Sequence, residues 1–181
     1  MFKPARILSV LLLLLVALTL PALAATEEED RYFPLSNATK DTFSTYFLDF
    51  KTLQHVPADA HFDFVKNPEQ VYKDKGYLQA WVKVEYEKNG AKEVVESLKM
   101  QERNIAGYDR LAFSLQLLRV RPATKEVSLL EQADYDKNGK VLGRIVHPTD
   151  RWVPYDVEAR IKEICEKLVV AQRAFYANGG R

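Results

Sequence analysis

The sequence predicts an α+β fold, namely an antiparallel β-sheet of five or six strands with a C-terminal α-helix packed on one face. Residues 77–87 alternate between apolar and polar side chains, as expected of a strand with one buried face. Further strand-like segments follow one another across short turns, which is typical of antiparallel pairing. Near the C-terminus, apolar residues recur at the spacing of an amphipathic helix.

Six segments have the composition of strands, and in chain order they are residues 32–35, 42–50, 77–87, 110–120, 125–135 and 140–147. The first is expected at a sheet edge, because Pro34 has no backbone N–H to donate to a neighbouring strand. Residues 51–76 contain two prolines and weak periodicity, so they are expected to form a long connection with a helical turn at 68–72.

Two helices complete the predicted fold. Residues 91–102 form a short amphipathic helix after Asn89-Gly90 ends the preceding strand. A longer helix is capped by Asp156 and runs to about Tyr176. Its expected apolar stripe consists of Val157, Ile161, Ile164, Cys165, Leu168, Val169 and Phe175.

The last two strands are predicted to form a hairpin, because Asn138-Gly139 lies between them and both turn positions are expected to have positive φ. Residues 134–139 also match the first half of a calcium-binding loop, with oxygen ligands at positions 1, 3 and 5 and glycine at position 6. Position 12, where a bidentate glutamate belongs, is Ile145. We therefore predict a plain hairpin rather than a metal site.

Residues 1–24 have the three-part pattern of a cleavable signal peptide, with cleavage expected after Ala24. Lys3 and Arg6 supply the positive charge, and an apolar run over residues 7–20 is followed by small residues. A permanent membrane anchor is the alternative, but a spanning helix needs about 20 apolar residues. We expect a secreted, periplasmic or cell-surface protein with one domain over residues 25–181. No cysteine follows the small residues, so no lipid anchor is expected.

Charge and cysteine content exclude further classes. Loss of Lys3 and Arg6 with the signal peptide changes the formal net charge from +1 to −1, which does not indicate a nucleic-acid-binding protein. Cys165 is the single cysteine, so no intramolecular disulfide can form. Its place in the apolar stripe predicts a buried, inert thiol, and a disulfide between two chains is the alternative.

No catalytic pattern emerges from the sequence. His55, His61 and His147 have no spacing that fixes a metal geometry, and they are interpreted as solvated side chains. There is neither a Gly-x-Ser-x-Gly nucleophile motif nor a glycine-rich phosphate loop. We predict a protein that is not an enzyme, with no catalytic residues, no cofactor and no metal.

The two tryptophans allow two interpretations. Trp81 lies on the strand face opposite Val82 and Val84, and Trp152 follows the last strand. Both side chains either close the core under the C-terminal helix, which we favour, or belong to a surface that binds another protein.

Four segments that span most of residues 25–181 are, in chain order, 45–49, 80–86, 135–142, and 152–154 with the helix up to Cys165. In this order and spacing they resemble the surface-adhesin protein E family of small exported bacterial proteins. The resemblance implies a bent antiparallel sheet with a C-terminal helix packed on it. It also implies binding to a protein, such as a host extracellular-matrix protein.

The chain departs from that family in two places. Many members carry a second cysteine near the position of residues 121–122 that is able to pair with the helix cysteine, whereas Cys165 has no such partner here. Residues 51–76 are also longer than the family leads us to expect. Because the second cysteine is missing, the disulfide between helix and sheet that the resemblance implies is not expected here. The longer segment 51–76 bears on any binding surface that the family has on this loop.

Export and the resemblance together predict an adhesin E-type envelope or surface protein that acts by protein–protein binding without a cofactor. One alternative is a periplasmic accessory or structural protein with no host ligand, and another is a small-ligand binder. A homodimer is a further expectation, because edge strands expose backbone donors and acceptors to a second copy.

Overall fold

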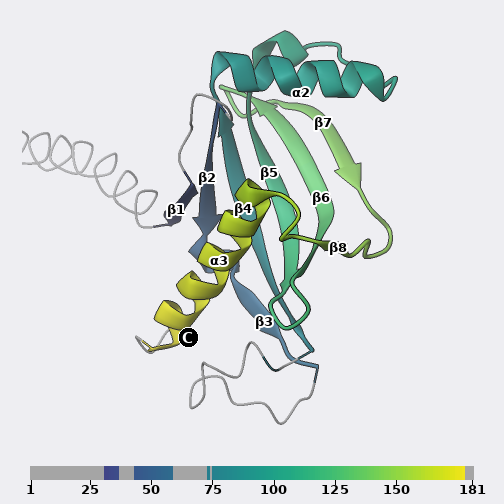
Figure 1. The fold of residues 1–181 in the computed structure, drawn as a ribbon. Coiled ribbons are helices and arrows are strands. Elements are labelled where there is room, and N and C mark those ends of the chain that lie inside the picture. Colours follow the sequence, from purple (N-terminus) through teal and green to yellow (C-terminus); the bar gives the residue numbers. More distant parts are fainter. Residues whose placement is uncertain (1–30, 37–42, 59–72, 74, 178–181) are drawn as a thin grey trace, which may run out of the picture. The chain divides into compact units, whose positions relative to one another are not determined.

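The computed structural model describes residues 31–36, 43–58, 73 and 75–177 (Figure 1). The chain divides into two units, Met1–Tyr32 and Phe33–Arg181, and nearly all described residues belong to the second. The predicted signal peptide over 1–24, the predicted helical turn at 68–72 and His61 lie outside the described residues.

The described strands form one sheet, whose main order is β1-β2-β4-β5-β6-β7, with short β3 beside β4 and short β8 beside β6. The strands are β1 (Tyr32–Ser36), β2 (Ser44–Asp49), β3 (Gln54–Val56), β4 (Tyr77–Tyr86), β5 (Leu111–Arg121), β6 (Glu126–Asp136), β7 (Val141–Val146) and β8 (Val153–Pro154). The helices are α2 (Lys88–Met100) and α3 (Ala159–Ala177), with 3-10 turns η1 (Phe50–Thr52) and η3 (Tyr108–Arg110). The predicted α+β fold is confirmed.

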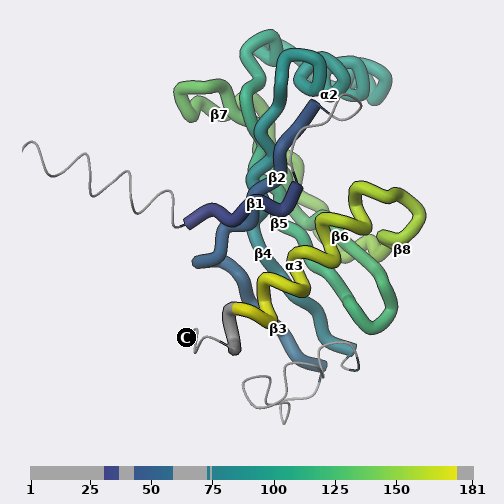
Figure 2. The backbone as a smooth tube through the Cα atoms, turned by 60° about the vertical axis from the view of Figure 1, so that its left-hand side comes forward, coloured from purple at the N-terminus to yellow at the C-terminus, as the bar shows by residue number. Residues whose placement is uncertain are grey.

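The main core lies between α3 and one face of the sheet, which we call the covered face (Figures 1 and 2). Strand β4 supplies its centre, because the predicted alternation directs every second side chain into the core. These side chains are Leu78, Ala80, Val82 and Val84, all fully buried. From α3, Ile164, Cys165, Leu168 and Val169 pack against them. Burial of each large apolar side chain favours folding by roughly 1.5–3 kcal/mol.

Helix α2 begins three residues before its predicted start. The backbone N–H of Ala91 donates to the carbonyl of Glu87 at 2.9 Å, and Glu87 N–H donates to the carbonyl of Phe43 at 2.8 Å. Asn89 and Gly90, expected to end the strand, therefore lie in the first helical turn. A Cβ at Gly90 would come within 2.4 Å of the Phe43 oxygen, so the close approach requires glycine.

Helix α3 begins after its predicted cap. Its first residue is Ala159, and the carbonyl of Glu158 accepts from Lys162 N–H at 2.9 Å. The expectation that Asp156 caps the helix is therefore wrong. Val157 precedes the helix and is 81% exposed, so its place in the apolar stripe is also wrong. The rest of the stripe whose side chains are described is confirmed: Ile164, Cys165, Leu168 and Val169 are buried, and half-buried Ile161 packs against the core.

Two short strands were not predicted. Strand β3 lies in the expected long connection, and β8 lies between the last predicted strand and α3. The aromatic strand β2 ends at Asp49 because the Asp49 Oδ1 atom accepts from Lys51 N–H at 3.1 Å and holds the η1 turn. Segments of two or three residues carry no periodicity, so pairing with β4 and β6 alone defines them.

The predicted hairpin of β6 and β7 is confirmed, with a different turn. Of the two residues Asn138 and Gly139, only Gly139 has a positive φ, at 76°. Gly139 N–H donates to the Asp136 carbonyl at 3.0 Å, which makes a four-residue turn that ends in a left-handed glycine. The Oδ1 atom of Asp136 accepts from the N–H groups of Asn138 at 2.8 Å and Lys140 at 3.0 Å. Because a carboxylate tightens this turn, a second positive φ is not needed.

A β-bulge interrupts the pairing of β5 with β6. Leu117 pairs with Glu131 but Leu118 pairs with Leu129, which leaves Leu130 as the extra residue. Between the bulge and the β5–β6 connection, odd-numbered residues of β6 face α3. Between the bulge and the hairpin, even-numbered residues do, as the direct pairing of Ser114 with Asp134 shows.

Candidate functional site

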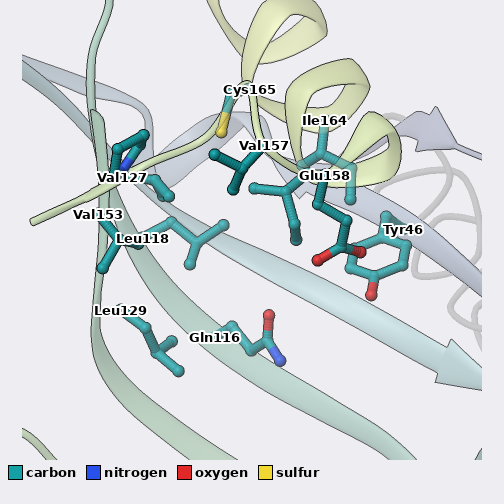
Figure 3. Close-up of a pocket in the computed structure, with 12 residues that line it drawn as sticks. Tyr46, Gln116, Leu118, Val127, Leu129, Val153, Val157, Glu158, Ile164 and Cys165 are labelled. Carbon is teal, nitrogen blue, oxygen red and sulfur yellow. The ribbon is translucent and has the colours of Figure 1, made fainter. Parts of the chain in front are cut away.

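An apolar groove of about 400 Å³ opens on the covered face, between the beginning of α3 and strands β5, β6 and β8 (Figure 3). Its apolar lining consists of Leu118, Val127, Leu129, Val153, Pro154, Val157, Ile161, Ile164 and Cys165. Cys165 and Val157 approach it from the α3 side and Leu118 from the sheet (Figure 3). The core packing therefore leaves a space that apolar side chains surround.

The groove has a polar end. Tyr46, Gln116 and Glu158 complete its lining, and the carboxylate of Glu158 lies beside the Tyr46 ring (Figure 3). These three residues and Leu129 also line a second cavity of about 610 Å³, which we call the polar cavity. The groove and the polar cavity are therefore neighbours on one face of the sheet.

Charged side chains of both signs line the polar cavity. Arg103 and Arg160 are its arginines, and Glu93 and Glu158 are its glutamates. The Arg160 guanidinium lies 4.8 Å from the centre of the Tyr46 ring and donates a hydrogen bond to the Ser44 carbonyl. A cation held by a ring face and a carbonyl is well fixed in position.

A buried polar cluster lies beside this cavity. Asp134, only 1% exposed, accepts hydrogen bonds from the hydroxyl of Tyr108 at 2.8 Å, the hydroxyl of Ser114 at 2.5 Å and the amide of Gln132 at 2.9 Å. The Tyr86 hydroxyl lies 3.0 Å from Ser114 Oγ. These bonds satisfy a carboxylate whose burial would otherwise be costly.

The tyrosines of the cluster are held as neutral donors. Burial raises the pKa of Tyr86 above its ordinary value. Burial and the hydrogen bond to Asp134 raise the pKa of Tyr108 in the same direction. Neither phenol ionises near neutral pH, so both act as structural donors rather than as bases. A Cβ at Gly143 would lie 2.2 Å from the Tyr108 hydroxyl oxygen, so glycine makes room for this donor.

The opposite side of the sheet, which we call the open face, carries aromatic and basic side chains. The core clusters to which α2 and α3 contribute do not lie on this face. Cross-strand pairing places Gln79 beside Arg119, Trp81 beside Leu117 and Lys83 beside Leu115. All six side chains are half-buried. The expectation that Trp81 and Trp152 close the core under α3 is wrong, since neither belongs to it.

Stacked contacts order the open face. The Arg121 guanidinium lies 3.7 Å from the centre of the Trp152 ring, and Arg119 lies 4.6 Å from that of Tyr77. Lys83 lies 5.1 Å from the centre of the Phe113 ring, which stacks on Tyr135 at 4.9 Å. Cations are attracted to the negative face of an aromatic ring, so these contacts fix the positions of the side chains on the open face.

The histidines whose placement is described are not brought together. His55 lies in β3 and pairs with Leu78 of β4. His147 is exposed, lines the polar cavity, and its backbone N–H donates to Leu130 of β6. Within residues 31–36, 43–58, 73 and 75–177, no three His, Cys, Asp or Glu side chains are grouped to hold a metal ion. The Asp136 carboxylate, a possible ligand in the rejected calcium interpretation, caps the hairpin turn instead.

Cys165 is buried as predicted, with 1% exposure. Burial raises the pKa of its thiol to about 12, so the reactive thiolate is scarce near neutral pH. Its sulfur lies at the apolar end of the groove, where it acts as a small apolar group (Figure 3). The part of the chain that the structure describes contains no helix with the length and hydropathy of a membrane span.

The groove residues were not predicted from the sequence. Gln116 and Glu158 lie far apart in the chain, and the fold alone brings them together with Tyr46. The sequence placed Val157 in the apolar stripe of the C-terminal helix, so no signal marked it as part of a groove lining. Comparisons of the chain with protein-family models, curated proteins and solved structures gave no match.

Proposed function

We propose that the chain is an exported envelope or surface protein of the adhesin E type, which binds another protein through the open face and catalyses no reaction. The observation that supports this most directly is the exclusion of Trp81 from the core. Tryptophan, tyrosine and arginine are the residues most enriched at interface hot spots. The open face presents all three.

The stacked arrangement favours binding because it reduces the entropy lost on association. A long cationic side chain that is already held over a ring has fewer conformations to lose. Arg119 also pairs with Asp150 at 2.9 Å, and Arg144 with Glu131 at 2.8 Å. Such alternation of charge suits a polypeptide better than a polyanion. A host extracellular-matrix protein is the partner that we propose.

A pull-down with the purified protein tests this proposal, with Trp81→Ala as the open-face variant and Val170→Ala as its control. Val170 is 58% exposed and belongs to α3, which packs on the covered face and not on the open face. Loss of a hot-spot side chain costs about 2 kcal/mol or more, so the Trp81→Ala protein should lose at least roughly 30-fold in affinity for immobilised matrix proteins. Equal binding by both variants would contradict the proposal, provided that their melting curves show folded protein.

Localisation is tested separately. Antibody labelling of intact cells should detect the protein if it reaches the surface. Labelling that requires permeabilised outer membranes would instead favour the periplasmic accessory role.

We also propose self-association through β7 as a second protein contact. In the described sheet β7 pairs only with β6, and its Val141 and Val146 are 52% and 58% exposed. An unpaired strand edge with apolar side chains is a template for a second chain. Sedimentation velocity should show a dimer that Val146→Lys dissociates, and a monomer at all concentrations would contradict this contact.

A further inference from the structure

The apolar groove is a candidate binding region on the side of the sheet opposite the open face. Its volume of about 400 Å³ lies within the range of small-molecule sites, roughly 300–1,000 Å³. Val153 and Val157 contribute to its lining although they are 44% and 81% exposed. Water in such a space finds few hydrogen-bond partners, so transfer of a hydrocarbon chain into it is favourable.

The polar end sets a second requirement on the occupant. Tyr46, Gln116 and Glu158 line both the groove and the polar cavity, so one molecule can reach from the first into the second. A pure hydrocarbon would leave these polar groups without compensation for lost water. The occupant that satisfies both regions carries a hydrocarbon chain and a polar head.

The charges of the polar cavity indicate the kind of head. Its two arginines, Arg103 and Arg160, are balanced by Glu93 and Glu158. Arg160 is already engaged by the Ser44 carbonyl and the Tyr46 ring. An anionic or cationic head would gain little net attraction from balanced charges and would still lose hydration.

Neutral hydrogen-bonding groups, in contrast, line the cavity. Gln116 donates from its amide nitrogen to Gln132 at 3.1 Å, and Gln132 donates to Asp134 at 2.9 Å. This chain of bonds orients the Gln116 amide at the junction of groove and cavity. Hydroxyl groups, which both donate and accept, are the best complement to amides and carboxylates of fixed orientation.

We propose that the groove binds the hydrocarbon chain of a neutral amphiphile of the acylglycerol class, whose hydroxyl-bearing head lies in the polar cavity. This site is additional to the protein-binding role proposed for the open face. It involves no covalent step, since the Cys165 thiol at its apolar end stays protonated.

Isothermal titration calorimetry with 1-octanoylglycerol, at concentrations that keep it monomeric, tests the chain and the head together. Glycerol has the head without the chain, and octanoate and octyltrimethylammonium have the chain with a charged head. We expect 1-octanoylglycerol to bind at least about tenfold more tightly than each of the three. Equal or weaker binding relative to either charged probe overturns the choice of head, and equal binding of glycerol overturns the site.

Matched variants locate the binding. Val157→Arg places a charge at the groove, whereas Val170→Arg places the same charge at an exposed position of α3 outside the groove lining. We expect Val157→Arg to weaken 1-octanoylglycerol binding by about tenfold or more and Val170→Arg to leave it unchanged. Equal effects of the two variants, or no effect of either, overturn the location.

The Trp81→Ala variant separates this inference from the proposed function. It should bind 1-octanoylglycerol as the unaltered protein does, because Trp81 lies on the other side of the sheet. Loss of lipid binding in a folded Trp81→Ala protein would overturn the assignment of two independent sites. Failure of matrix-protein binding alone would leave the groove assignment intact.

Discussion

The two faces of the sheet are built from alternate residues of the same strands, yet they differ in what holds their side chains. On the covered face, Val82 of β4 and Leu168 of α3 are fully buried in the main core. On the open face, Trp81 and Lys83 are half-buried and ordered by neighbours on adjacent strands. The covered face therefore stabilises the fold, and the open face is available for a partner.

The largest expected effect is on the covered face. Leu168→Ala removes a fully buried side chain and leaves a cavity, which should lower the free energy of unfolding by about 2–5 kcal/mol. The adjacent control Val170→Ala should change it by less than about 0.5 kcal/mol, because Val170 is largely exposed. Urea denaturation followed by circular dichroism measures both. Similar losses in the two variants would show that α3 is not packed as described.

The next effect concerns the polar part of the covered face. Gly143→Ala would force its Cβ against the Tyr108 hydroxyl and should destabilise the protein by roughly 1–3 kcal/mol. Tyr108→Phe removes that hydroxyl and leaves Asp134 with one donor fewer, at a cost of about 1–3 kcal/mol. In the double variant the contact with the hydroxyl oxygen, the closest of the contacts, is removed, so the two losses should sum to more than the combined loss. Strict additivity in this cycle would contradict the close contact.

A smaller effect is expected from acid. Hydrogen bonds from the backbone of Lys140 and Asn138 hold the pKa of Asp136 below its ordinary value. A depressed folded-state pKa stabilises the fold above the unfolded pKa of about 3.9, and this stabilisation is lost as pH falls through the folded value. Asp136→Ala should therefore be less stable than the unaltered protein near neutral pH, with a difference that shrinks in acid. Urea denaturation from neutral pH down to acid measures the difference in unfolding free energy between the two proteins. A difference that stays constant with pH would contradict the capping of the hairpin by Asp136.

The last prediction concerns the reactivity of Cys165, where the smallest change is expected. Its thiol should not react with iodoacetamide in the native protein. Burial limits access, and the raised pKa limits the thiolate. Mass spectrometry should detect alkylation only when denaturant is added. Rapid labelling under native conditions would contradict the burial of this thiol.

The fold was largely predictable because its main strands have clear patterns. The alternation in β4 survives in the structure from Leu78 to Val84, and the α3 stripe from Ile164 to Val169 is buried as predicted. Errors gathered where local signals compete with pairing. Asn89-Gly90 indicated the end of a strand, but the Phe43 carbonyl that approaches Gly90 comes from a distant segment.

The candidate sites were less predictable, because each is made by contacts between distant residues. The groove joins Tyr46 of β2, Gln116 of β5 and Glu158 before α3, and no local pattern links them. Trp81 was the partial exception, since its position opposite Val82 indicated the outer face of the strand.

Leu130, the extra residue of the β6 bulge, decides which chemistry meets α3. If Leu130 were paired as a regular strand residue, simple alternation from Val127 and Leu129 would continue, and Glu131 and Ala133 would turn toward the helix in place of Gln132 and Asp134. Tyr108 would then lose its acceptor, and the polar end of the groove would lose its amide. A regular pairing of this one leucine would thus invert half a strand, so the separation of apolar and polar halves on a single surface depends on a backbone irregularity rather than on any side chain's own chemistry.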